Sequence, residues 1–218
     1  MNLRDIVTYW QGLHCDDRGR WIHSDDGPTF DSMQHSFNLD FPVSPYVGDI
    51  LRAPVIILGA NAGYRADVTP IEFPDEATIQ AYRNRVRYPS DSDWSSVAPY
   101  YSNVNYGALI ANGAAVLVNA CAYRSPKISA EPENRRLIRR LPSVVITRRW
   151  LLEAVRPLLV SNQRIVIVKR GGLWELPVDF KLLPGVTVDP APISPQLTAT
   201  AWAVVQSRLR AFNERAYE

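Results

Sequence analysis

The chain has 218 residues, 46% hydrophobic and 21% charged, which is enough to bury one sizeable core in an ordinary globular protein. No apolar run approaches the ~18 residues of a membrane span and the N-terminus lacks the apolar segment of a signal peptide, so we expect a cytoplasmic protein without a membrane partner. The net charge is only +2, so attraction for phosphate would have to come from uneven local charge.

The first half of the chain predicts two helices and one strand. A short helix is expected within residues 3–13, followed by a loop-like stretch at 20–53 that is rich in Asp, Ser and Pro. The apolar run VIILG at 55–59 predicts a buried strand, and GANAGY at 59–64 predicts a tight exposed turn. Pro74 and the acidic residues after it predict a helix at 74–87.

The second half alternates helices and strands more regularly. Apolar spacing predicts an amphipathic helix at 143–160, and Ser194 followed by Pro195 predicts the start of a long C-terminal helix. The remaining expected elements are a helix at 104–113 and strands at 114–120, 164–171 and 185–190.

Strands that are apolar on both faces and separated by helices favour a three-layer α/β/α fold with a central, mostly parallel sheet of about four strands. We expect one domain over 1–218, with 1–50 as a loop-rich N-terminal extension. Ligands of such folds bind at the carboxyl ends of the strands. Four segments at those ends are therefore candidate site walls: Gly59–Tyr64, Asn119–Ser125, Lys169–Trp174 and Asp189–Pro195.

Two of these strand ends carry an asparagine, Asn61 and Asn119. An amide offers both donors and an acceptor, which suits recognition of the flat edge of a nucleobase. Gly59 and Gly63 would let a ligand approach the backbone closely. Each asparagine alone is also typical of a turn or cap, whereas two in register favour a site.

Other kinds of site find little support in the sequence. The histidines His14, His23 and His35 all lie before the predicted strands, so no catalytic triad is expected. Cys15 and Cys121 fit no metal-ligand spacing and predict free thiols in a reducing compartment. The phosphate-loop and dinucleotide motifs are absent, so we expect no metal and no cofactor.

Positive charge is concentrated between Arg135 and Arg170, where ten Lys or Arg residues accompany one acid, Glu153. Such a stripe can attract phosphate, although a solvated helix face would have the same composition.

Taken together in this order, the strand ends resemble motifs of the uracil-DNA glycosylase superfamily over roughly residues 50–210. Gly59-Ala60-Asn61-Ala62-Gly63 is similar to the Gly-x-Asn-Pro-Gly motif of the mismatch-specific and single-strand-selective classes. The second motif is an apolar strand that ends in an asparagine, and AVLV followed by Asn119 is similar to it. The segment Asp189–Trp202 is similar to the His-Pro-Ser-Pro loop and the helix that follows it.

The resemblance implies flipping of a base from single- or double-stranded DNA into a pocket. Asn61 would position the water that attacks the sugar, Asn119 would pair with the base edge, and Phe73 would stack on it. Gly63 would leave the C5 side of the base open, and Tyr64 and Arg65 would flank the mouth. The other implied DNA contacts are a wedge at Ile193 with Ser194 beside it, and phosphate contacts from Arg124, Lys169 and Arg170.

Two positions depart from these motifs: Ala62 replaces the proline, and Asp189 replaces the loop histidine that stabilises the departing base. Asp189 could instead accept a hydrogen bond from an amino group or ring N–H of a different base. Three hypotheses follow: a divergent DNA glycosylase for a damaged or modified base, a non-catalytic nucleic-acid or nucleotide binder with the same fold, and an α/β enzyme acting on a small metabolite. The oligomeric state is left open.

Overall fold

The computed structural model describes residues 1–95, 103–128, 131–191 and 194–215, and these residues contain a central sheet of five strands. The strands lie in the order β3 (Tyr46–Val47), β5 (Ala115–Ser125), β4 (Val55–Gly63), β6 (Ile165–Val168) and β7 (Val186–Val188). β4 lies at the centre and pairs in parallel with β5 and β6, and β7 is parallel to β6. β3 runs antiparallel to β5 at the edge.

The predicted α/β class with a mostly parallel sheet is confirmed, with five strands rather than about four. The additional strand, β3, has two residues and lies inside the stretch predicted to be loop-like. β3 is extended because it pairs with Leu117 and Val118 of β5, and its own two residues are too few to show a strand pattern in the sequence. The same stretch also holds β2 (Trp21–His23), which pairs with β1 (Leu13–Cys15), and α2 (Gly27–Ser32).

The predicted turn at 59–64 is wrong, because β4 continues through Gly63. β5 is also longer than expected and runs to Ser125, so it supplies pairing partners for the extended part of β4. The register shifts between Asn61 and Gly63, where Asn61 pairs with Cys121 and Gly63 with Ser125. The end of the strand pair is therefore irregular but extended.

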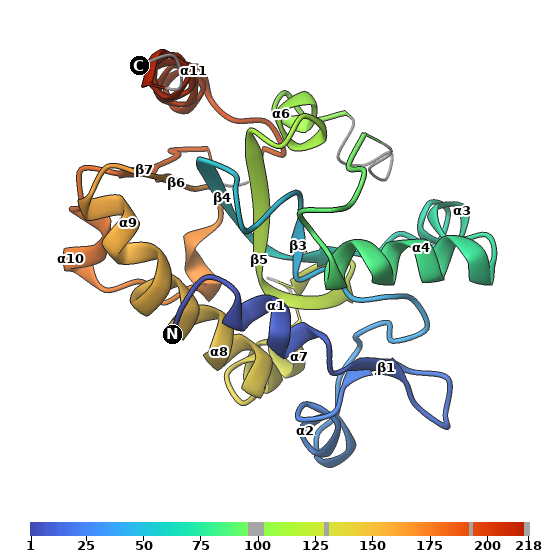
Figure 1. Cartoon of the computed structure of the whole chain (residues 1–218). Helices are drawn as coiled ribbons and strands as arrows, with labels where there is room; N and C mark the ends of the chain where they lie inside the picture. Colours follow the sequence, from blue (N-terminus) through green and yellow to red (C-terminus); the bar gives the residue numbers. More distant parts are fainter. Residues whose placement is uncertain (96–102, 129–130, 192–193, 216–218) are drawn as a thin grey trace.

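Helices cover both faces of the sheet (Figure 1). On one face, Ile56 and Leu58 belong to the core that includes residues of α1 (Asp5–Trp10), α4 (Glu76–Arg87), α7 (Pro132–Ile138), α8 (Pro142–Trp150), α9 (Arg156–Val160) and α10 (Val178–Lys181). On the other face, Val55 and Ile57 pack with α6 (Gly107–Ala111) and α11 (Ala199–Arg215). This two-sided burial is why the strands lack an apolar–polar alternation.

The predicted helices are present with shifted boundaries. The helix expected at 143–160 forms as α8, a π-helical turn at Leu151–Val155, and α9, and the π turn comes just before Pro157, which has no N–H to donate. The C-terminal helix begins at Ala199 rather than at Ser194, and the Thr198 hydroxyl accepts a hydrogen bond from the Ala201 N–H at 3.3 Å. Two further short segments are helical, α3 (Thr69–Glu72) and the 3₁₀ turn at Gly171–Leu173.

Among the described residues, no helix is both long and apolar enough to cross a membrane. Cys15 is exposed and Cys121 is buried, and both are free thiols.

A buried carboxylate joins the N-terminal segment to the rest of the fold. Asp26 accepts hydrogen bonds from the Tyr123 hydroxyl at 2.6 Å and from the Ser143 N–H, at the start of α8, at 3.0 Å. The Tyr123 hydroxyl in turn accepts from the His23 N–H. Burial raises the pKa of Asp26, although these hydrogen bonds oppose that rise.

We expect Asp26→Ala to lower the free energy of unfolding by roughly 2–5 kcal/mol, because it leaves the buried Tyr123 O–H and Ser143 N–H without an acceptor. Urea denaturation followed by circular dichroism measures this change. Asp25→Ala removes an exposed neighbouring carboxylate and is the matched control. Equal effects of the two substitutions would contradict the role given to Asp26.

Candidate functional site

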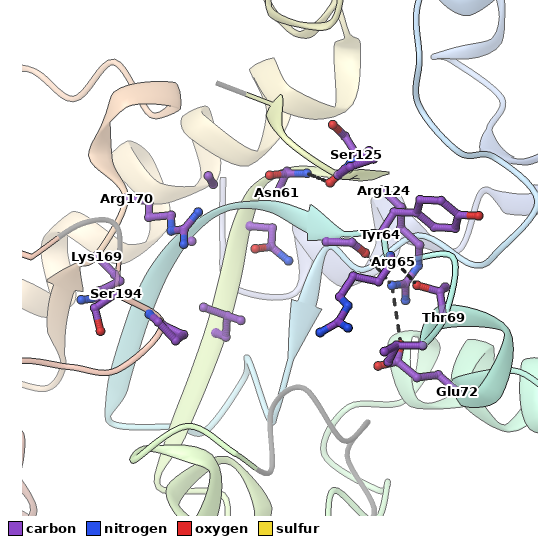
Figure 2. A pocket seen from close by; sticks show the side chains of 18 of the residues that line it. Asn61, Tyr64, Arg65, Thr69, Glu72, Arg124, Ser125, Lys169, Arg170 and Ser194 are labelled. Carbon is purple, nitrogen blue, oxygen red and sulfur yellow. Dashed lines mark hydrogen bonds and ion pairs between the residues drawn. The ribbon is translucent and has the colours of Figure 1, made fainter. Parts of the chain in front are cut away.

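A cavity of about 270 Å³ opens at the carboxyl ends of β4, β5 and β6, where the sequence predicts a site. Its lining includes ten of the predicted site residues: Gly59, Asn61, Gly63, Tyr64, Arg65, Asn119, Arg124, Lys169, Arg170 and Ser194. In Figure 2, Lys169, Arg170 and Ser194 lie on one side of Asn61, and Arg65, Thr69 and Glu72 lie on the other.

Asn61 projects from the last part of β4. Its amide nitrogen donates to the Ala62 carbonyl at 2.7 Å and to the Ser125 carbonyl at 3.4 Å (Figure 2). A carbonyl can only accept, so these two bonds define which end of the amide is nitrogen. No hydrogen bond to Asn61 Oδ1 is found in the part of the chain that the structure describes, so this oxygen is available to a ligand or water.

Asn119 lies on β5 directly opposite Gly59 of β4 and is only 3% exposed. Its amide nitrogen donates to the Ser44 carbonyl at 2.8 Å, which again defines the orientation of the amide. Its Oδ1 lies against Gly59, where an added Cβ would be 2.5 Å from the oxygen. Gly59 therefore provides space for the Asn119 amide, in the middle of an extended strand rather than in a turn.

Residues of the segment after β6 also form hydrogen bonds with the floor of the cavity. The indole N–H of Trp174, which is fully buried, donates to the Gly59 carbonyl at 2.6 Å. The backbone N–H groups of Lys169 and Arg170 both donate to the Leu58 carbonyl. These bonds tie the segment after β6 to β4 and bring Lys169 and Arg170 to the cavity.

Asp189 does not line the cavity, contrary to the prediction. Its carboxylate accepts from the N–H groups of Ala191 at 2.9 Å and Thr198 at 3.0 Å, and it pairs with the Lys169 ammonium at 3.2 Å. Burial alone would raise the pKa of Asp189, but the two N–H groups and Lys169 together hold that pKa below its ordinary value. Asp189 therefore joins β6, the loop after β7 and the start of α11 instead of contacting a base.

Lys169 lines the cavity but does not offer an unpaired ammonium for a phosphate. Besides Asp189, it donates to the Ala191 carbonyl at 2.6 Å, and it is 3% exposed. Its predicted contact with phosphate is replaced by a structural role.

Phe73 is also absent from the cavity lining. One face of its ring is covered by the Arg124 guanidinium at 5.0 Å from the ring centroid, and its neighbours include the ring of Tyr82 at 5.3 Å. Phe73 therefore packs in the core beneath Arg124 instead of stacking on a base. Its burial within the apolar cluster explains why an aromatic residue at a plausible position is not a site residue.

Arg124 is buried at the cavity wall and is used internally. It donates from Nε to the Pro42 carbonyl at 2.9 Å and from Nη1 to the Gly63 carbonyl at 3.0 Å. Its Nη1 also lies 3.8 Å from Glu72 Oε2. Arg124 thus fixes the end of β4, and the predicted phosphate contact is not supported by its surroundings.

Three other predicted residues, Tyr64, Arg65 and Ser194, also line the cavity. Arg65 forms an exposed ion pair with Asp67 at 2.6 Å, and Tyr64 lies beside it in Figure 2. Ser194 Oγ accepts a hydrogen bond from the Gln196 N–H at 3.1 Å. Ile193, the predicted wedge, lies outside the described residues.

Glu72, Thr69 and Tyr106 also line the cavity, although no motif in the sequence predicts them as site residues. The Glu72 side chain is 7% exposed. Burial raises the pKa of Glu72 above its ordinary value of 4.5, against the opposing attraction of Arg124. The available signal was a single glutamate in TPIEFPDE, which nothing in the local pattern distinguishes from the acids that follow it.

Most of the predicted basic stripe is paired within the protein. Its ion pairs join Arg139 and Arg148 to Glu175, Arg149 to Glu153, Arg156 to Asp179, and Lys169 to Asp189. Arg164 is buried and donates to the Ile50 and Leu51 carbonyls. Over the described residues, no ion pair is found for Arg135, Arg136 or Arg140, so carboxylates neutralise one part of the predicted stripe and leave another part cationic.

Within the described ranges, no group of three or more His, Cys, Asp or Glu side chains could hold a metal ion. Comparisons of the chain with protein-family models, with curated proteins and with solved structures give no match. The geometry of the cavity is therefore the basis for any functional assignment.

Gly59→Ala should disturb the cavity floor, because its Cβ would lie 2.5 Å from Asn119 Oδ1 and 3.2 Å from Leu117 Cδ1. We expect a loss of about 1–3 kcal/mol in the free energy of unfolding, typical of overpacking. Gly63→Ala is the matched control on the same strand, where an added Cβ meets nothing within 4 Å. Denaturation curves showing equal losses for both variants would contradict the close approach of Asn119 to Gly59.

The raised pKa of Glu72 leads us to expect a specific pH dependence of the free energy of unfolding. Because its pKa is raised in the folded state, its favourable contribution to folding is complete below the ordinary value of 4.5 and is lost as pH rises through the raised pKa. The difference in free energy of unfolding between Glu72→Gln and wild type should therefore change in favour of the variant from about pH 4 to about pH 7. Urea denaturation across this range measures it, and a change in the opposite direction would contradict the raised pKa.

Proposed function

We propose that this protein binds a single flipped or unpaired nucleobase of DNA in the cavity and hydrolyses its N-glycosidic bond. The observation that carries the proposal is that Asn61 and Asn119, on the adjacent parallel strands β4 and β5, line one cavity. Both amides are oriented by hydrogen bonds to backbone carbonyls, so they form a preorganised polar surface.

Asn61 has the chemistry required to hold a water molecule. Its N–H groups are bonded to Ala62 and Ser125, and its Oδ1 can accept a hydrogen bond from water. In the proposed reaction the hydroxyl of the water bonds to the sugar C1′, the C1′–N bond breaks, and the base leaves with the electron pair and gains the proton. An amide is no general base, so Asn61 contributes by positioning.

Three cations for which the described part of the chain shows no ion pair follow the cavity wall in sequence and suit contact with the DNA backbone. Lys127 follows the lining residues Ser125 and Pro126 and is exposed. Glu131, immediately before α7, accepts a hydrogen bond from the Ser125 hydroxyl, and α7 carries Arg135 and Arg136. Phosphate contacts from these side chains would make binding salt-dependent.

A second candidate function is recognition of the base without cleavage. It is favoured by Asp189, which occupies the position of the loop histidine in the resemblance and is turned toward Ala191, Thr198 and Lys169. A departing base carries developing negative charge and needs a donor. The carboxylate cannot supply one while these three groups hold it ionised.

The two candidates are separated by an assay of base release. Single- and double-stranded oligonucleotides carrying uracil, hypoxanthine or alkylated and oxidised bases are incubated with excess protein, and abasic sites are then cleaved with alkali. We expect cleavage at one class of base, reduced about 100-fold in Asn61→Ala because the water loses its position. Asn84→Ala, an exposed asparagine on α4, is the matched control.

Base-dependent binding without cleavage of any lesion would support the non-catalytic candidate. Absence of both cleavage and base-dependent binding would overturn the proposed function.

A further inference from the structure

The cavity has an unequal set of hydrogen-bonding groups, because its buried donors are used by the protein itself. Lys169 donates to the Ala191 carbonyl and Asp189, and Arg124 donates to the Pro42 and Gly63 carbonyls. The Ser125 hydroxyl, on the same wall, donates to Glu131. Each of these groups already has a partner in the frame of the protein, so part of its donor capacity is used internally.

The asparagine amides are oriented in the same sense. Asn61 directs its N–H groups to the carbonyls of Ala62 and Ser125, and Asn119 directs an N–H to the Ser44 carbonyl. Rotating either amide by half a turn would place its oxygen against a carbonyl oxygen, which is repulsive. The oxygens are therefore the ends of these amides that face away from their backbone partners.

Glu72 adds a third acceptor to the same cavity. Its nearest cation, Arg124, has a nitrogen at 3.8 Å, beyond hydrogen-bond distance, so the ion pair leaves the carboxylate able to accept from a ligand. No hydrogen bond to its oxygens is found from any residue that the structure describes. The hydroxyls of Thr69 and Tyr64 can donate or accept and adapt to either kind of ligand.

We propose that the cavity selects a nucleobase bearing an exocyclic amino group, such as cytosine or adenine, over uracil or thymine. This inference rests on the proposed function and specifies its substrate class. An amino group has two N–H donors, which can bond to two of the three oxygen-bearing groups of Asn61, Asn119 and Glu72. Carboxylate and amide oxygens are the groups with which proteins recognise the amino groups of cytosine and adenine.

A uracil or thymine edge would fit this set of groups poorly. Uracil and thymine carry a carbonyl oxygen where cytosine carries its amino group, so that oxygen would face an acceptor of the cavity. A site whose buried polar groups are left unpaired discriminates strongly against such a ligand. We therefore expect a difference in affinity of about tenfold or more between amino-bearing and carbonyl-bearing bases.

The test compares short single strands in which every nucleotide is an abasic analogue except the central one, which carries the base to be tested. Backbone length and charge are identical, so affinity measured by fluorescence anisotropy differs only through the base. Wild-type protein should bind the cytosine or adenine strand about tenfold or more tightly than the uracil strand. Glu72→Gln replaces one acceptor with a donor and should reduce or reverse this preference, and Glu76→Gln, an exposed glutamate, should leave it unchanged.

Equal or tighter binding of the uracil strand by wild-type protein would overturn the amino-group inference while supporting base binding itself. The wild-type comparison needs no variant to fold. Binding of every strand no tighter than a strand without any base would overturn both the inference and the proposed function. An amino preference unchanged in Glu72→Gln would remove Glu72 from the recognition set.

Discussion

The position of the Asn119 side chain against Gly59 is the constraint on which the candidate site depends. Gly59 has no side chain, so the Asn119 amide can lie against the strand, where a Cβ would be 2.5 Å from its oxygen. From the segment after β6, the indole N–H of Trp174 donates to the Gly59 carbonyl. The floor of the cavity is thus defined by one residue and its contacts on both sides, and Asn61 follows two residues later on the same strand.

Buried ionic groups hold the walls around this floor. Asp189 and Lys169 connect the loop after β7 to α11, and Arg124 connects the end of β4 to Pro42 and Glu72. Each of these charged side chains accepts or donates several hydrogen bonds, and these bonds offset the cost of burying its charge. An apolar side chain could not bond to the same backbone groups. The use of these charged side chains as a frame commits them to partners within the protein, whereas the oxygens of Asn61 and Glu72 have no hydrogen-bond donor among the described residues, and this difference directs the proposed choice of base.

The charge of the surface formed by residues 135–170 depends on which of its arginines form ion pairs with carboxylates. Ten basic residues between Arg135 and Arg170 indicate a strongly cationic stripe, yet Arg148, Arg149 and Arg156 each form an ion pair with a carboxylate. Glu175 and Asp179, which follow the stripe in sequence, supply two of those carboxylates. Attraction for a polyanion therefore depends on local unpaired cations and not on the number of arginines.

The sequence by itself determined the α/β class, the order of the principal helices and strands, and the edge of the sheet at which Asn61 and Asn119 meet. Apolar runs and strand order express local burial and parallel pairing, which a single sequence records. Only the tertiary structure decided which polar residues face the cavity. Asp189 bonds to groups of the protein and Phe73 packs in the core, whereas Glu72 lines the cavity. Each orientation depends on a partner that is distant in sequence, Lys169 for Asp189 and Arg124 for Phe73 and Glu72, and the local pattern does not show these partners.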